Sequence, residues 1–158
     1  MMSDYEKGLW ATALKGIRRG FDEANDDRFY AVVEQAAGNC DLFVAKTLMG
    51  TFSDTFEPDG TQECVNRVLS SATPQIRAQA VLEELARLET EAKEDAEALL
   101  EEAVRFFPEV LIGVAAEQGP ETRVTLVRML NDLSKQEIKS GRPDIFAPII
   151  LRLGGLVS

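Results

Sequence analysis

The fold is decided by the stretch TPQIRAQAVLEELARL, which covers residues 73–88. Thr73 and Pro74 mark a helix start, because Thr is a good N-cap and Pro is tolerated at the first helical position. Apolar residues follow at helical spacing and share one face: Ile76, Ala80, Val81, Leu85 and Leu88. This pattern predicts an amphipathic helix that packs on a core.

The same spacing continues toward the N-terminus. A capping box at Ser3 and Glu6 precedes an apolar stripe, which we expect to be the buried face of the first helix. The stripe has i,i+4 spacing and is widened by two further residues: Tyr5, Leu9, Ala13, Ile17 and Phe21, with Trp10 and Leu14. A second helix is predicted over residues 26–37 and ends at Gly38. Asn39 is the expected N-cap of a third helix, and residues 53–60 read as a loop.

Helical patterns also fill the C-terminal half. One helix is predicted over residues 91–107, and a shorter one begins at Pro108, with residues 110–115 apolar on every side and therefore enclosed by neighbours. Another helix contains residues 124–133. The last helix is expected to start at Pro143 and to be kinked or split by Pro148.

No period-2 pattern or hairpin signal interrupts these helices. The sequence therefore predicts an all-α protein of about eight to ten helices in a single domain, residues 1–158. Short connections favour antiparallel neighbours, so we expect stacked αα-hairpins that resemble HEAT-like helical arrays.

The composition removes many kinds of chemistry. The chain has 27 acidic and 17 basic residues, a net charge of −10 and no histidine. Histidine-dependent catalysis and histidine-ligated metal sites are excluded, and the negative charge argues against nucleic-acid binding. The loop around Gly60 does not fit the EF-hand pattern. We therefore expect no enzyme activity, no cofactor and no metal site.

The cellular setting follows from smaller signals. Neither a signal peptide nor a membrane-spanning stretch is recognisable, which predicts a cytoplasmic protein without a membrane partner. Cys40 and Cys64 do not form a CxxC motif and are expected to be buried free thiols. The oligomeric state does not follow from the sequence.

Acidic residues concentrate in residues 83–102, which hold nine acids against Arg87 and Lys93, a net charge of −7. Such a segment is either a solvated helix face or a docking surface for a basic partner. The candidate contact residues are five acids of this segment: Glu94, Asp95, Glu97, Glu101 and Glu102. A second candidate group lies nearer the N-terminus: Asp26, Asp27, Asp54 and Asp59. For Asp26 and Asp27, helix capping is the competing interpretation.

Two stretches resemble bacterial all-helical immunity proteins that accompany polymorphic and contact-dependent toxins. Residues 42–54 resemble the early helix and acidic loop of that family, and residues 123–132 resemble its late helix, while its His-x-x-Glu stretch is missing. The resemblance implies that the chain binds and neutralises a cognate toxin domain, such as a nuclease or deaminase with a basic surface. A non-catalytic acidic adaptor or scaffold that binds another protein is the alternative.

Overall fold

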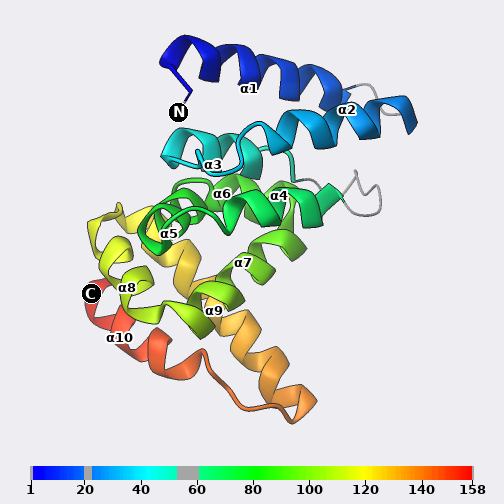
Figure 1. Cartoon of the computed structure of the whole chain (residues 1–158). Coiled ribbons are helices and arrows are strands. Elements are labelled where there is room, and N and C mark those ends of the chain that lie inside the picture. Colours follow the sequence, from blue (N-terminus) through cyan, green and yellow to red (C-terminus); the bar gives the residue numbers. More distant parts are fainter. Residues whose placement is uncertain (1, 20–22, 53–60, 158) are drawn as a thin grey trace.

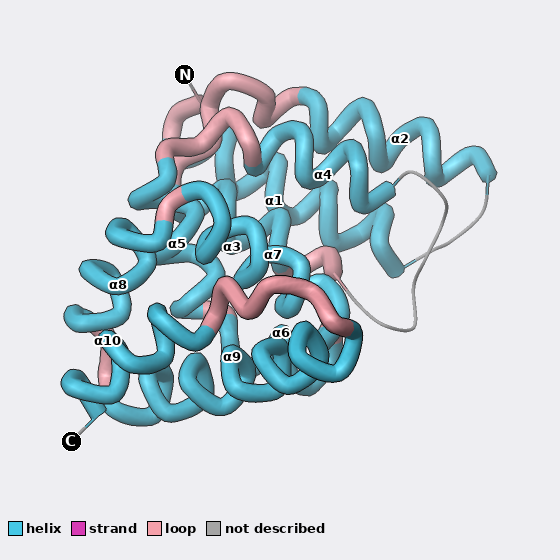
Figure 2. Tube along the Cα trace, turned by 90° about the horizontal axis from the view of Figure 1, so that it is seen from below, coloured by secondary structure: helices cyan, strands magenta, loops and turns pink. Residues whose placement is uncertain are grey.

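The computed structural model describes residues 2–19, 23–52 and 61–157, which form ten helices and contain no strand (Figures 1 and 2). The all-α prediction is thereby confirmed. In chain order the helices are α1 (Asp4–Arg19), α2 (Glu23–Glu34), α3 (Leu42–Met49), α4 (Thr61–Leu69), α5 (Pro74–Glu83), α6 (Leu85–Glu91), α7 (Lys93–Phe106), α8 (Pro108–Glu117), α9 (Pro120–Ser140) and α10 (Ala147–Val157).

Several helix starts are those that the sequence predicts. The Thr73 hydroxyl accepts a hydrogen bond from the Ile76 amide at 3.2 Å, and Pro74 occupies the first turn of α5. The Ser3 hydroxyl likewise accepts from the Glu6 amide at 3.2 Å. Each bond satisfies an amide that has no partner inside the helix.

The cap of α3 differs from the prediction. Asp41, not Asn39, is the N-cap, and its carboxylate accepts from the Val44 amide at 2.9 Å. Lys7 of α1 forms an ion pair with the same carboxylate. Asn39 lies two residues too early, and its side chain bonds instead to the Ala37 carbonyl at 3.4 Å.

Two other predicted helices have different bounds. The helix expected over residues 73–88 is divided at Glu84 into α5 and α6. Pro143 lies outside the last helix, because the Asp144 carboxylate accepts hydrogen bonds from the amides of Phe146 and Ala147 where α10 begins. Pro148 therefore falls in the first turn of α10, where its missing N–H costs nothing, and it neither kinks nor splits the helix.

Helix α5 lies at the centre of the fold. It contacts α3 on one side and α8 on another, and it also touches α6, α7 and α9. Its buried residues are Ala78, Ala80, Val81 and Leu82. Helix α1 packs on α2 and α10 packs on α9, so the two ends of the chain form sequential helix pairs (Figure 1). A HEAT-like stacking of all the hairpins is not confirmed.

The surroundings of α8 agree with its apolar sequence. Leu111, Val114 and Ala115 are buried, and Val110 and Ile112 are half-buried against the core. This helix is covered by α5, α7, α9 and α10.

Helix α1 buries only one side of the apolar stripe that the sequence predicts. Trp10 and Leu14 are buried, and the Trp10 indole donates to the Val32 carbonyl of α2 at 2.6 Å. Tyr5 and Leu9, which belong to the predicted buried stripe, are 77% and 56% exposed. The helix thus has two apolar faces, and α2 and α3 cover only one of them.

Candidate functional site

An open groove of about 720 Å³ lies between α3 and α6. Helix α1 contributes Lys15 to its edge. Residues of α3 and of the turn that follows form one wall: Leu42, Phe43, Lys46, Thr47, Gly50 and Thr51. The opposite wall consists of Glu84, Arg87 and Glu91. The volume of this groove is in the range of typical ligand pockets.

The helical period of α3 explains its exposed aromatic ring. Val44 and Leu48 face the core and are fully buried. Phe43 and Thr47, one turn apart, point the other way, and Phe43 is 46% exposed. The Thr47 hydroxyl donates to the Phe43 carbonyl at 2.8 Å, so its hydrogen-bonding capacity is used within the helix. The groove therefore has an apolar centre on α3.

Arg87 fixes the groove wall to the end of α3. Its guanidinium donates to the Met49 carbonyl at 2.6 Å and to the Glu91 carboxylate at 2.8 Å. A cation at a helix C-terminus is favourable because the last carbonyls carry partial negative charge. Arg87 thus joins α3 to α6, and its Nε is buried without a hydrogen-bond partner among the described residues.

Lys46 makes the second link across the groove. Its ammonium lies 3.2 Å from the Glu83 carboxylate and 3.9 Å from that of Glu84. All three side chains are partly exposed. The charged edge of the groove is therefore built from paired acids and bases that surround Phe43.

The five candidate acids of residues 94–102 all lie on α7 and outside this groove. Glu94 is exposed in the first turn, whereas Asp95 and Glu97 are partly buried. Glu101 forms an i,i+4 ion pair with Arg105 at 2.8 Å. For Glu94 and Glu97, the described part of the chain contains no basic side chain within ion-pair distance.

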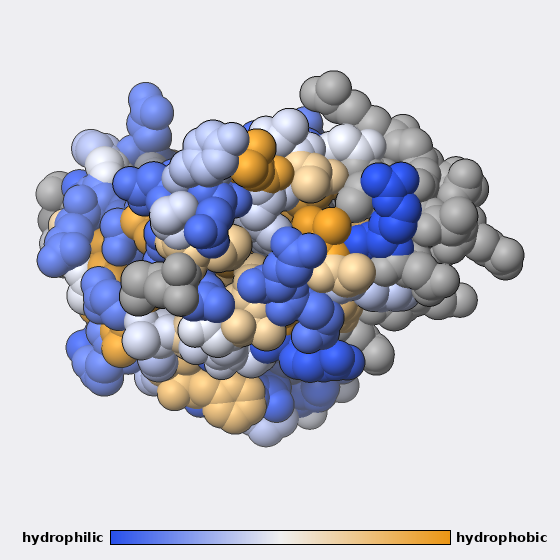
Figure 3. Space-filling view, turned by 45° about the horizontal axis from the view of Figure 1, so that its top comes forward, coloured by the Kyte–Doolittle hydropathy of each residue, from blue (hydrophilic) through white to orange (hydrophobic). Residues whose placement is uncertain are grey.

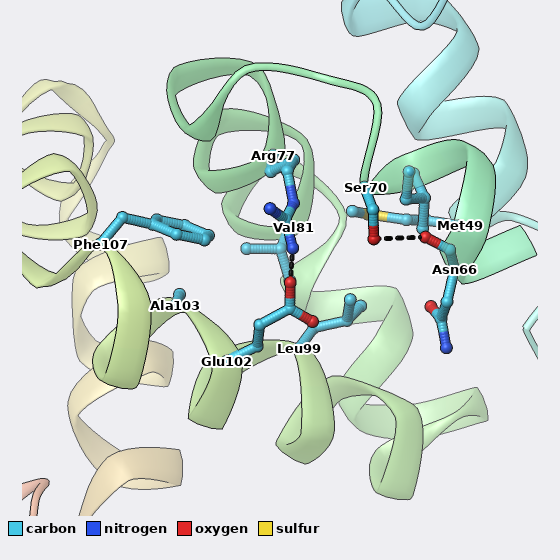
Figure 4. A pocket seen from close by; sticks show the side chains of 10 residues that line it. Met49, Asn66, Ser70, Arg77, Val81, Leu99, Glu102, Ala103 and Phe107 are labelled. Carbon is cyan, nitrogen blue, oxygen red and sulfur yellow. Dashed lines mark hydrogen bonds and ion pairs between the residues drawn. The ribbon is translucent and has the colours of Figure 1, made fainter. Parts of the chain in front are cut away.

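Glu102 is occupied by a structural ion pair. It meets Arg77 of α5 beside a small cavity of about 20 Å³, and the Arg77 guanidinium lies 5.1 Å from the centre of the Phe107 ring (Figure 4). The Arg77 side chain is only 19% exposed, and burial lowers the pKa of its guanidinium. Glu102 is thus a link between α5 and α7 rather than a free surface acid.

Ion pairs neutralise much of the acidic segment. At least six of the nine acids in residues 83–102 have a basic partner: Glu83, Glu84, Glu89, Glu91, Glu101 and Glu102. Lys46, Arg77 and Arg128 reach these acids from other helices. The local field is therefore weaker than the net charge of −7 suggests.

The second candidate group is only partly described. Asp26 and Asp27 lie on α2, which begins at Glu23, but their side chains are outside the described set. Asp54 and Asp59 lie outside the described residues altogether. These four residues stay candidates from sequence alone.

Both cysteines are free and buried, as predicted. Burial raises the pKa of the Cys40 thiol to about 11; nearby Asp41 adds to the effect and Arg77 opposes it. Burial also raises the pKa of Cys64, and Glu34 acts in the same direction. At neutral pH both thiols are protonated, which suits a packing role.

The sequence patterns missed the groove. Phe43 was available as a signal, because it lies opposite the apolar stripe of its own helix. Lys46 bonds to Glu83, 37 residues away, and Arg87 bonds to Met49, 38 residues away, and spacing rules do not reach so far.

Within the described ranges there is no group of three or more Cys, Asp or Glu side chains that could hold a metal ion. None of the described helices combines the length and the apolar character needed to cross a membrane. No protein-family model, curated protein or solved structure matches the chain.

Proposed function

We propose that the chain is an immunity protein that binds and neutralises a toxin protein, with the groove between α3 and α6 as its main contact site. The observation that carries the binding role is the half-exposed Phe43, which lines a groove together with charged side chains. The resemblance of residues 42–54 and 123–132 to helical immunity proteins supports the choice of a toxin as partner.

The groove has the composition of a protein-binding surface. Interfaces typically combine an apolar centre with a polar rim, and a few anchor residues carry most of the binding energy. Phe43 and Leu42 supply the apolar centre here, while Lys46, Arg87 and Glu91 supply the rim. Because the rim charges are already paired, a partner gains little from them, and Phe43 is the expected anchor.

Unpaired acids extend the surface beyond the groove. The groove wall ends at Glu91, and Glu94 and Glu97 follow within six residues on α7. Acids without an internal partner attract a basic surface and speed its association. We expect Glu94 and Glu97 to guide a basic toxin domain toward the groove, and Glu102 to take no part.

The test is co-expression of this chain with the product of the adjacent gene, followed by a pull-down and a growth-protection assay. Phe43→Asp should weaken the complex about 30-fold or more and abolish protection, because it places a charge at the apolar centre. Phe106→Asp is the matched control, since Phe106 is 73% exposed on α7 and does not line the groove.

The two variants separate the outcomes. Loss of binding with Phe43→Asp alone supports the groove, provided that both proteins keep the wild-type circular dichroism spectrum. Equal losses for both variants, or full protection by Phe43→Asp, contradict the groove assignment. A neighbour that is not toxic and does not bind contradicts the immunity function itself.

A further inference from the structure

Helix α1 has an apolar face that nothing in the described chain covers. Tyr5 and Leu9 are largely exposed, and Ala13 is exposed one turn further on. Helix α1 is the first helix of the fold and lies at its edge (Figure 1). Figure 3 looks toward this end of the molecule, where orange apolar patches interrupt a mainly polar surface. Exposed apolar side chains gathered on one helix face often mark an interaction site.

The glycines of α1 lie on the same open side. A Cβ atom built on Gly8 or Gly16 meets nothing within 4 Å, so no neighbouring helix of this chain explains them. Each glycine destabilises the helix relative to alanine. The Thr12 hydroxyl donates to the Gly8 carbonyl at 2.9 Å, which uses its polar group inside the helix. The two glycines therefore leave room on the exposed side of α1 for side chains of a partner.

We propose that this face binds a second copy of the chain, with the two α1 helices antiparallel. Residues 11 apart in an α-helix differ by only about 20° in direction and are about 16 Å apart along the axis. Tyr5 and Gly16 thus lie on one line of the exposed face. A two-fold axis between residues 10 and 11 places Tyr5 of each copy over Gly16 of the other, and Leu9 over Thr12.

The charges of the face fit the same arrangement. Asp4 and Lys15 are also 11 residues apart, and both are exposed on one flank of α1. The antiparallel pairing brings Asp4 of one copy within about 3 Å, along the helix axis, of Lys15 of the other. Lys7 of the same chain also lies near Asp4, but its ammonium is bonded to Asp41.

These relations favour a second copy over an unrelated partner. A two-fold symmetric interface requires a face that is complementary to a copy of itself rotated by 180°. Helix α1 meets this condition twice, since a large residue and an acid lie near one end while a glycine and a base lie near the other. A single helix pair buries less than the roughly 800 Å² per partner of a standard interface, so the dimer is expected to be weak.

Sedimentation equilibrium of the full chain, from about 10 µM to about 1 mM, tests the proposal. The wild-type protein should change from monomer to dimer across this range. Leu9→Lys should weaken the dimer at least tenfold. Leu151→Lys is the matched control, because Leu151 is equally apolar and highly exposed but lies on α10, and it should leave the dimer unchanged.

A charge swap tests the antiparallel register. Asp4→Lys and Lys15→Asp should each weaken the dimer, and the double variant should restore it, because the opposite charges then face each other again. Circular dichroism verifies that each variant is folded. A wild-type protein that is monomeric at about 1 mM, or a Leu151→Lys effect as large as that of Leu9→Lys, overturns the proposal. Failure of the double variant to restore the dimer overturns the pairing.

Discussion

Replacing Arg77 by Ala should lower the free energy of unfolding by about 2–3 kcal/mol. The ion pair with Glu102 is half-buried, so its loss falls between the 0–1 kcal/mol of exposed pairs and the 3–5 kcal/mol of broken buried pairs, and we take about 1–2 kcal/mol. The position of the guanidinium over the Phe107 ring adds about 0.5–1 kcal/mol. Packing of the side-chain stem accounts for the remainder.

The assay is urea and thermal unfolding followed by circular dichroism. For a chain of this length, a loss of 2–3 kcal/mol corresponds to a fall in melting temperature of about 5–10 °C. A double-mutant cycle of Arg77→Ala with Glu102→Gln isolates the pair, and we expect a coupling energy of about 1–2 kcal/mol. The exposed i,i+4 pair of Arg105 and Glu101 is the control, with an expected coupling of about 0.3–0.5 kcal/mol.

A coupling at Arg77 and Glu102 no larger than the control would refute the reasoning. The burial of the pair would then not strengthen it, and Glu102 would regain its place among the candidate surface acids. A large coupling, together with normal partner binding by Glu102→Gln, assigns this acid to stability.

Three further predictions concern local features. Asp144→Asn should lower the melting temperature at about pH 6, because hydrogen bonds from Ser134 and two amides hold the pKa of Asp144 below its ordinary value of 3.8. The wild-type protein loses this stabilisation as the pH falls below about 3.8, and the two proteins should then melt alike. Gly141→Ala should lower the free energy of unfolding in urea by about 1–2 kcal/mol, because Gly141 has φ +73°. Gly113→Ala, at an open helical position, should raise it by about 0.5–1 kcal/mol. Similar effects of the two variants would contradict the assigned backbone. A thiol reagent at about pH 8 should modify Cys40 slowly in the native protein and rapidly in urea, because a pKa of about 11 leaves about one thiolate in a thousand; fast native labelling would show that the thiol is accessible.

Local sequence signals predicted the helices well where a cap or a proline fixed the start. Thr73 with Pro74 and Ser3 are examples, because their hydrogen bonds span only three residues. The apolar stripe of α1 is buried at Trp10 and Leu14 but exposed at Tyr5 and Leu9. A periodic stripe shows that a helix face is apolar, but the position of the helix within the fold decides whether that face is covered. Trp10 is on the buried side, where its indole donates a hydrogen bond to the Val32 carbonyl.

The candidate site was harder to predict because charge sums ignore tertiary pairing. Glu89 and Arg128 are 39 residues apart, yet their side chains meet at 2.5 Å. Such ion pairs neutralise acids on the surface, and no pattern in the neighbouring sequence reveals them. The groove depends on the same long-range contacts, since Arg87 reaches the end of α3 from another helix.

The central position of α5 has a consequence for how the protein loses its structure. A linear array can unravel from one end, because each unit touches only its neighbours. Here α5 contacts α3 from the N-terminal half and α8 and α9 from the C-terminal half. Neither half retains its core when the other is lost. Unfolding of the residues from α3 to α10 should therefore be a single cooperative transition, with only the outer α1–α2 pair free to detach earlier.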